Sequence, residues 1–443
     1  MEVCTIGGFE EVGKNMTAVK VGEDVIIFDM GIFLPPVIEL QEQENQQSYT
    51  EKQLREVEAL PDDKILDKLG WRNKVKAIAI GHAHLDHVGG VPYISYRYPN
   101  AQILATPFTM KVLDKISKDE KIKIKNKKRE IKMGQKVKIN NNLTLEFLNI
   151  THSTLQCAFI AMHTQEGVFF YALDFKLDNH PVIGNPPDYK RFREIGKKGV
   201  KALVIDALYS GTDRRTASER IARNLLEDAL SYTNKKNALF ITTFSSHIAR
   251  LKSIVDFGKR TGREIIFIGR SLNKYVKCAI EVNQCPFKDR IKLVAYKNQV
   301  NSILRKVEKN REKYLVVCTG HQGETGSILD RIVKGGTPFK FKADDNIIFS
   351  SKVIPAPINV SQRERLDKKL KKTGVRIQSE VHVSGHGGRE DLRDMIEILK
   401  PDNIIPAHGS LQQETPLIEL ATELGYDFGK SVHLSSDGKV LKF

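Results

Sequence analysis

The sequence has no hydrophobic run long enough to form a membrane-spanning helix. Such a helix needs about 20 consecutive apolar residues, and no segment of the 443 residues approaches this length. The first residues, 1–6, read as the start of a strand and lack the basic-then-apolar pattern of a secretory signal peptide. We therefore expect a cytoplasmic protein without membrane association.

Cysteine is scarce and has no regular spacing. The chain has five cysteines, an odd number, scattered at Cys4, Cys157, Cys278, Cys285 and Cys318. This distribution argues against a disulfide framework and favours a reducing compartment. No two cysteines have the spacing of a zinc-finger pair, so any metal site must rely on histidine and carboxylate ligands.

Acidic residues are fewer than basic ones. Lysine and arginine number 70 and aspartate and glutamate 54, which gives a formal net charge of +16 and a pI near 9.4. A field of this sign attracts polyanions, of which nucleic acid is the commonest. A role of the charge in solubility alone is the alternative.

Short apolar runs in the first half of the chain predict buried strands. The runs at 25–28, 75–80 and 102–105 are continuous rather than alternating, which suits strands covered on both faces. A chain of this length is also expected to form two domains.

From about residue 210 the pattern changes to an alternation of helices and strands. A helical period at 218–232 is followed by an apolar run at 238–241, and the alternation continues, as in a doubly wound parallel sheet. Further strands are expected after Asp345, including one at 381–383. We therefore predict an α/β domain at 210–345, inserted into a first domain formed by 1–209 and 346–443.

Four side chains able to bind metal stand within six residues, directly after the predicted strand at 75–80. They are His82, His84, Asp86 and His87. Because the chain turns at a strand end, these side chains can converge on one point. Imidazole with carboxylate suits Zn²⁺, with Mn²⁺ and Fe²⁺ as alternatives. A chance cluster would be a rare coincidence in a chain with 12 histidines.

Other candidates follow other predicted strands: Asp29, His152, Asp174 and His408. Each alone would be an ordinary polar residue at a strand end. Together they would supply a carboxylate shared by two metals and one further histidine for each metal. That is the composition of a two-metal hydrolytic site.

The order of these residues resembles the motifs of the metallo-β-lactamase superfamily. Asp29 precedes the His-x-His-x-Asp-His element at 82–87, and His152 and Asp174 follow. This element is far more specific than a glycine-rich loop. The resemblance implies an α/β fold in which two sheets lie between helices, the metallo-β-lactamase αββα sandwich.

Later motifs resemble the β-CASP branch of this superfamily, whose members act on nucleic acids. Asp206 resembles its first acidic motif, while His386 in Ser-Gly-His-Gly-Gly and His408 in Pro-Ala-His-Gly resemble its later histidines. The α/β segment at 210–345 would then be the inserted β-CASP α/β domain.

Two further segments, 7–16 and 382–387, resemble the ribonuclease J family, and the resemblance extends through essentially the whole chain. Only 35 residues follow His408 (443 − 408), so we expect the shorter archaeal form of the family. Residues 153–156 and 207–209 depart from the bacterial pattern. These departures touch no predicted ligand, and we expect any effect of them on the shape of the pocket and therefore on fine specificity.

The resemblance implies two Zn²⁺ ions per subunit. The ligands of one would be His82, His84 and His152, and those of the other Asp86, His87 and His408. Asp174 would be shared between the two ions, and Asp29 would support the ligands rather than bind metal.

For catalysis the resemblance implies Asp86 at the metals, His386 as the general acid for the leaving 3′ oxygen, and Asp206 as the carboxylate that orients an imidazole. A carboxylate partner favours the protonated imidazole that a proton donor requires. A structural histidine in a glycine-rich turn is the alternative for His386.

The resemblance also implies a pocket for the 5′ phosphate of RNA, in which backbone amides and a hydroxyl surround the anion. Its residues would be His382, Val383, Ser384, Gly385 and His386. His382 as an ordinary strand residue is the alternative. The segment 320–324 is predicted either to contact RNA or to be a plain turn, and Lys14, Arg250 and Arg270 are candidates for lining the RNA path.

The function implied is a zinc-dependent ribonuclease that degrades single-stranded RNA from 5′ to 3′. It would prefer a 5′ monophosphate and release mononucleotides, with internal cleavage as a further mode. Alternatives are an endonuclease of the same branch that processes RNA 3′ ends, a small-molecule metallo-hydrolase, and a non-catalytic RNA-binding subunit. DNA as substrate and the oligomeric state, with a homodimer as the candidate, stay open.

Overall fold

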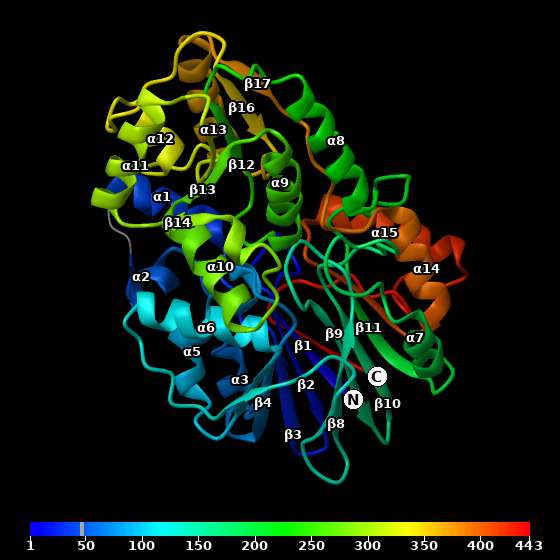
Figure 1. The fold of residues 1–443 in the computed structure, drawn as a ribbon. Helices are drawn as coiled ribbons and strands as arrows, with labels where there is room; N and C mark the ends of the chain where they lie inside the picture. Colours follow the sequence, from blue (N-terminus) through cyan, green and yellow to red (C-terminus); the bar gives the residue numbers. More distant parts are fainter. Residues whose placement is uncertain (45–47) are drawn as a thin grey trace. The chain divides into compact units, whose positions relative to one another are not determined.

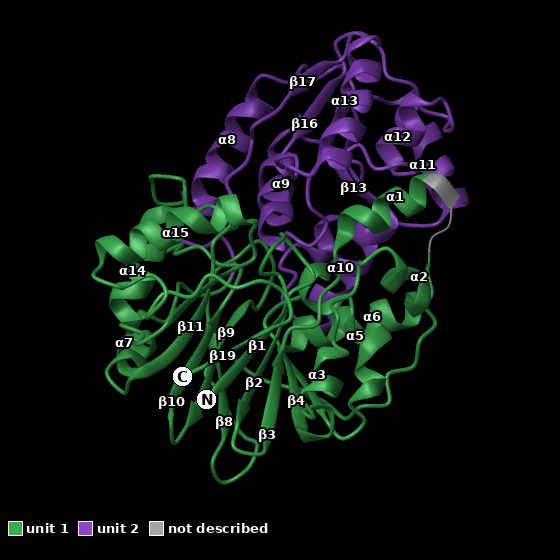
Figure 2. Cartoon of the chain, turned by 180° about the vertical axis from the view of Figure 1, so that it is seen from behind, with its two compact units in different colours: residues 1–179, 184–216, 385–443 green, residues 180–183, 217–384 purple. Residues whose placement is uncertain are grey.

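The structure is a computed structural model that describes residues 1–44 and 48–443. It divides into two compact units, which Figure 2 shows in different colours. The first unit comprises residues 1–179, 184–216 and 385–443, and the second comprises 180–183 and 217–384. The second unit therefore interrupts the first in the sequence.

The first unit contains a seven-stranded sheet and a six-stranded sheet. In spatial order, the strands of the seven-stranded sheet are β19 (Lys439–Lys442), β1 (Glu2–Gly7), β2 (Met16–Val21), β3 (Asp24–Phe28), β4 (Val75–Ile80), β5 (Gln102–Ala105) and β6 (Lys128–Glu130). Those of the six-stranded sheet are β18 (Ile404–Ala407), β11 (Val200–Asp206), β10 (Gly167–Ala172), β9 (Ala158–Thr164), β8 (Thr144–Asn149) and β7 (Lys136–Lys138).

Side chains from both sheets form one core between them. The Phe28 ring of β3 lies 5.0 Å from the Phe169 ring and 5.3 Å from the Tyr171 ring of β10, centroid to centroid. Phe170 points to the opposite face of β10, because side chains alternate along a strand, and packs on Phe159. Burial on both faces explains why β10 is a continuous apolar run.

Helices cover the outer face of each sheet, which gives the αββα sandwich (Figure 1). On the six-stranded sheet these are α7 (Tyr189–Gly196), α14 (Arg389–Leu399) and α15 (Leu411–Glu423). On the side of the seven-stranded sheet lie α3 (Ile65–Lys68), α5 (Val91–Ile94) and α6 (Pro107–Asp119). The remaining helices of this unit are α1 (Leu34–Glu44), α2 (Glu51–Glu56) and α4 (Leu85–Val88). The sandwich implied by the sequence is confirmed.

The second unit is built on a six-stranded sheet in which every pairing is parallel. Its strands, in spatial order, are β14 (Lys292–Val294), β13 (Glu264–Ile268), β15 (Tyr314–Cys318), β12 (Leu239–Thr242), β16 (Asn346–Phe349) and β17 (Arg376–Gln378). Its helices are α8 (Glu219–Ser231), α9 (Ile248–Arg260), α10 (Arg270–Glu281), α11 (Lys297–Lys309), α12 (Ile328–Val333) and α13 (Pro357–Lys371).

The second unit extends beyond the predicted boundary at Asp345. Strand β16 pairs in parallel with β12, from Leu239 beside Asn346 to Thr242 beside Phe349, and the unit continues to residue 384. The strand predicted at 381–383 is wrong, since this segment has no regular secondary structure. The Val381 carbonyl instead accepts hydrogen bonds from the side chains of Ser350 and Arg250.

The five cysteines are all buried as free thiols in the part of the chain that the structure describes. Within residues 1–44 and 48–443, every helix is too short or too polar to span a lipid bilayer.

Candidate metal centre

Asp29, Asp206 and most of the predicted metal ligands end or follow strands that have a parallel neighbour, and the carboxyl ends of these strands lie at the same edge of each sheet. Strands β3 and β4 are parallel neighbours, so Asp29 and the 82–87 motif leave one sheet together. Strands β10, β11 and β18 are parallel in the other sheet, and they bring together Asp174, Asp206 and His408. The topology of the first unit therefore gathers residues that are far apart in the sequence.

Three of these residues have a left-handed backbone. The φ angles are 58° at Asp29, 50° at Asp174 and 62° at His408. Among L-residues, asparagine, aspartate and histidine adopt this conformation most often, and positions of this kind collect at functional sites. It turns each chain sharply away from its strand and directs the side chain across the sheet edge.

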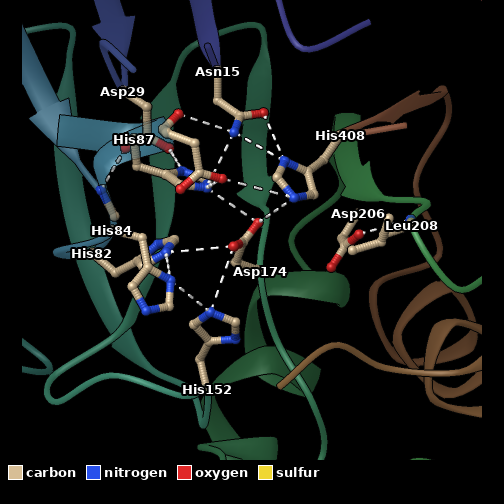
Figure 3. Close-up of polar contacts among 12 residues, drawn as sticks. Asn15, Asp29, His82, His84, His87, His152, Asp174, Asp206, Leu208 and His408 are labelled. Carbon is tan, nitrogen blue, oxygen red and sulfur yellow. Dashed lines mark hydrogen bonds and ion pairs between the residues drawn. The ribbon is translucent and has the colours of Figure 1, made fainter. Parts of the chain in front are cut away.

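Asp174 lies at the centre of the cluster, as Figure 3 shows. Its Oδ2 atom lies 3.4 Å from His82 Nε2 and 3.5 Å from His152 Nε2. Its Oδ1 atom lies 3.2 Å from His87 Nε2 and 3.5 Å from His408 Nε2. The two carboxylate oxygens thus face two different sets of nitrogen atoms.

The potential ligand atoms fall into overlapping groups, within each of which all atoms lie within 4.8 Å of one another. One group is His82, His84, His152 and Asp174, a second is Asp86, His87 and His408, and a third is Asp174, His386 and His408. All seven residues predicted as ligands therefore lie in one cluster.

The second ring nitrogen of three histidines is held by a hydrogen bond. His87 Nδ1 donates to Asp29 Oδ2 at 2.7 Å, and His152 Nδ1 donates to the Gly385 carbonyl at 2.8 Å. His408 Nδ1 lies beside the Asn15 side-chain amide, 2.9 Å from Nδ2 and 3.1 Å from Oδ1. The carboxylate beside His87 and the carbonyl beside His152 can only accept, so they select the tautomer whose Nε2 lone pair is directed into the cluster.

The sequence did not assign two of these partners. Asn15 is fully buried, and its amide nitrogen also donates to the Asp86 carbonyl at 3.1 Å. At Gly385 a Cβ atom would lie 2.9 Å from His152 Cε1, so only glycine permits this approach. Both residues lie in segments that the resemblance had singled out, 7–16 and 382–387, but nothing local distinguished their roles.

The pKa values of the clustered histidines are shifted, downward for three of them and upward for His87. Burial lowers the pKa of His82 and His152, and burial with the neighbouring His82 lowers that of His84 to about 3. These imidazoles are therefore neutral, as metal ligands must be. Burial also lowers the pKa of His87, but the carboxylates of Asp174, Asp86 and Asp29 outweigh it and raise the pKa well above 6.5.

Asp174 itself has an atom that suits a cation. Burial raises its pKa, but the surrounding histidines, His408 first, outweigh this and hold the carboxyl ionised. Its Oδ1 is buried and accepts no hydrogen bond from the described residues. A buried carboxylate needs compensating charge. Neutral imidazoles, ionised carboxylates and this unsatisfied oxygen together fit Zn²⁺.

His386 has a different partner. Its Nδ1 donates to Asp206 Oδ2 at 2.7 Å, while Asp206 Oδ1 accepts from the Leu208 backbone amide at 2.9 Å. Burial lowers the pKa of His386, but Asp206 and then Asp174 raise it to about 9. The imidazole is therefore protonated at neutral pH, with Nε2 3.9 Å from Asp174 Oδ2.

The residues predicted for the phosphate pocket are divided in the structure. His382, Val383 and Ser384 belong to the second unit and Gly385 and His386 to the first. The pocket stays a prediction.

The cations predicted along the RNA path differ in their surroundings. Arg250 is fully buried, so it lines no open channel. Lys14 lies 3.3 Å from both Glu11 and Asp437. In the 320–324 loop, the buried His321 ring packs 4.4 Å from Phe244.

Three families match different parts of the chain. Residues 64–210 match the family described as a beta-lactamase superfamily domain, and residues 236–364 match "Ribonuclease J, beta-CASP domain". Residues 374–434 match "Zn-dependent metallo-hydrolase RNA specificity domain". The two parts of the expected fold, the metallo-β-lactamase and the β-CASP domain, are confirmed by these matches.

Relatives of similar length exist in archaea. The chain is 42% identical to the ribonuclease J of Pyrococcus abyssi (strain GE5 / Orsay), over 100% of this chain and 97% of the relative. It is 39% identical to the ribonuclease J of Methanocaldococcus jannaschii, over 100% of this chain and 99% of the relative. The bacterial ribonuclease J 1 of Streptococcus pyogenes is 28% identical, over 99% of this chain and 74% of the relative.

A solved structure shares the fold. It is a protein of unknown function from Enterococcus faecalis V583, with a TM-score of 0.67, 16% sequence identity and 99% of both chains covered.

The His386–Asp206 pair generates a prediction about pH. In metal-free protein, Asp206→Asn should lower the pKa of His386 from about 9 toward 6.5, because the largest favourable charge is lost. In the unchanged metal-free protein, the ion pair between His386 and Asp206 contributes its full stabilisation of the fold below pH 6.5. This contribution to the free energy of unfolding is lost as the pH rises through about 9. Titration of the His386 ring proton by NMR measures the shift; an equal pKa in both proteins would contradict it.

Proposed function

Because this chain belongs to the ribonuclease J family, we propose that it is a two-zinc exoribonuclease that removes mononucleotides from the 5′ end of single-stranded RNA and prefers a 5′ monophosphate. Membership of the family makes the chain a metal-dependent ribonuclease. The number of ions, the polarity and the 5′ preference are the proposal.

The observation that carries the two-zinc proposal is that the two carboxylate oxygens of Asp174 face different histidines. One oxygen faces His82 and His152, and the other faces His87 and His408. We assign His82, His84 and His152 to one ion, and Asp86, His87 and His408 to the other, with Asp174 shared. When bound, such ions activate water and neutralise charge on a phosphodiester.

The residues of the chain supply positioning and the proton. Asp29 and Asn15 hold the rings of His87 and His408 by their Nδ1 atoms, which keeps Nε2 directed at Asp174. His386 carries a proton at neutral pH, and its Nδ1 is held by Asp206. We therefore assign His386 Nε2 as the donor of the proton that the leaving 3′ oxygen requires.

For the 5′ end, we assign the phosphate to the segment 382–384 and its continuation in Gly385 and His386. The net charge of +16 favours a polyanionic substrate, and the match of residues 374–434 to an RNA specificity domain supports RNA. An endonuclease that processes 3′ ends is the second candidate, since the same site would cut internal bonds if RNA entered without its 5′ end.

Metal removal should abolish cleavage. A chelator strips zinc from the site, whereas the basic residues that attract RNA remain, so RNA binding should persist. Elemental analysis should find two zinc ions per untreated chain, and adding zinc back should restore the rate. Cleavage assays and fluorescence anisotropy on the same samples measure both properties, with mock-dialysed protein as control. Full cleavage by metal-free protein would refute the zinc mechanism.

His386→Ala should slow cleavage by roughly 10²–10⁴-fold, the usual contribution of a general acid, without loss of zinc. A matched control is His433→Ala, because the His433 ring contacts Asn403 rather than the cluster. Single-turnover rates and zinc content of both variants are compared. A rate equal to that of the control removes His386 from the mechanism.

The test of polarity uses RNAs of one sequence that carry a 5′ monophosphate, triphosphate or hydroxyl and a label at either end. We expect labelled mononucleotide to appear first from the 5′ label, and fastest for the monophosphate. Internal fragments that form at the same rate for all three 5′ groups would favour the endonuclease instead.

A further inference from the structure

Half of the net positive charge of the chain lies in one short segment, between helix α6 and strand β8 (Figure 1). Residues 121–138 contain nine lysines and arginines and one acidic residue, Glu130, which gives a net charge of +8 (9 − 1) against +16 for the whole chain. All nine of these side chains are exposed. We call the nine lysines and arginines of residues 121–138 the basic flank.

The basic flank lies along the outer edges of both sheets of the first unit. Strand β6 is the last strand of the seven-stranded sheet, and β7 is the last strand of the six-stranded sheet. Exposed side chains alternate with half-buried or buried ones from 121 to 127, and Ile131 and Val137 belong to the core between the sheets. The apolar side chains therefore anchor the segment, and its cations point to solvent.

Strand β6 connects the basic flank to the edge of the sheet at which the metal ligands lie. It runs parallel to β5, which runs parallel to β4, and Glu130, Ala105 and Ile80 lie side by side at the carboxyl ends of the three strands. The 82–87 motif follows Ile80, and two strand spacings amount to about 10 Å. Residues 121–127 precede the opposite end of β6. The flank therefore extends along the sheet edge toward the metal cluster.

Most cations of the basic flank are not used within the fold. Lys128 is the exception, because its Nζ donates to Asp114 Oδ1 at 2.5 Å. The other eight form no ion pair with the residues that the structure describes, and Glu130 lies 3.3 Å from Lys111 of α6 instead. Uncompensated charge of one sign attracts a polyanion.

Protection of the sheet edges explains only part of this charge. Lysine on an edge strand prevents pairing with the edge of another chain, and β6 and β7 carry four of the cations, Lys128, Arg129, Lys136 and Lys138. Each of these strands has only three residues, and the other five cations lie outside both strands. Those five need another explanation.

The composition of the segment indicates which kind of polyanion it fits. Residues 121–138 contain no aromatic residue that could stack on a base, and every exposed large hydrophobic residue in the described part of the chain lies elsewhere. Protein interfaces have an apolar centre and few lysines, and segments that bind lipid surfaces bury apolar side chains. A surface of lysine without apolar side chains instead suits the phosphates of a flexible nucleic-acid strand.

We propose that the basic flank binds the part of an RNA substrate that lies outside the catalytic site. Its lysines and arginines contact phosphates without reading the bases, so the flank holds long RNA of any sequence while the metal centre cleaves it. This inference deepens the proposed function. It rests on RNA as the substrate, but not on the polarity of degradation or on the preference for a 5′ monophosphate.

The experiment uses a triple variant, Lys123→Gln with Lys125→Gln and Lys127→Gln, and the unchanged zinc-loaded protein. The RNAs have about 5 and about 30 nucleotides, because a single-strand site covers about 4–16 nucleotides and only the longer RNA reaches the flank. Phosphorothioate linkages keep the charge and resist cleavage, so Kd can be measured by fluorescence anisotropy. The changes are at exposed side chains and should leave the fold intact, which circular dichroism checks.

For the long RNA, Kd of the triple variant should rise roughly 10–100-fold at about 0.1 M salt. The slope of log Kd against log salt should fall by about 2, since each phosphate contact of a single strand contributes about 0.7. With cleavable long RNA, KM should rise while kcat stays the same. The short RNA should show the same Kd and the same cleavage rate in both proteins.

A matched control removes three other exposed lysines of the first unit, by Lys190→Gln, Lys197→Gln and Lys198→Gln. These residues lie on and directly after helix α7, which covers the outer face of the six-stranded sheet. The net charge falls by the same amount as in the triple variant, so an effect of total charge would be equal in both. Kd of the control for long RNA should stay close to that of the unchanged protein.

Arginine at positions 123, 125 and 127 keeps the charge, so this variant should bind long RNA like the unchanged protein. An unchanged Kd in the glutamine variant would overturn the inference and leave these lysines as protection of the sheet edge. An equal loss in the α7 control, or an equal loss for short RNA, would overturn it as well. Absence of RNA cleavage by the unchanged zinc-loaded protein would instead refute the proposed function itself, whatever the variants do to Kd.

Discussion

The carboxylate of Asp174 is the group on which the rest of the site depends. It is 2% exposed, and its two oxygens face separate pairs of histidine nitrogens. An ionised carboxylate in such a place is costly unless positive charge surrounds it. The sandwich meets this demand by ending parallel strands of both sheets at one edge, so that imidazoles from distant parts of the chain reach the same oxygen pair.

Much of this site was predictable because its signals are local. His82, His84 and His87 follow directly on a buried strand, and Asp29, Asp174 and His408 each follow another. A polar residue at the end of an apolar run is visible in sequence. Parallel pairing then brings such ends together. The same reasoning predicted the strand–helix alternation of the second unit.

What the sequence did not reveal depends on contacts between distant residues. Asn15 is 393 residues from His408, and Gly385 is 233 residues from His152. Strand β16 has the same apolar character as any buried strand, so only its pairing with β12 assigns it to the second unit. Arg250 was a candidate for lining the RNA path, whereas its ion pair with a carboxylate 31 positions away holds it in the interior.

The left-handed backbone at Asp29, Asp174 and His408 has a consequence for how the family can vary. At these positions the conformation as well as the chemistry restricts the side chain. Asparagine shares with aspartate a tolerance for this conformation. The substitution Asp174→Asn would therefore remove the negative charge while the backbone at this strand end keeps its conformation. A single substitution is therefore enough to give a folded chain that lacks the central negative charge. A β-branched or bulky residue at position 174 would instead disturb the backbone as well as the chemistry.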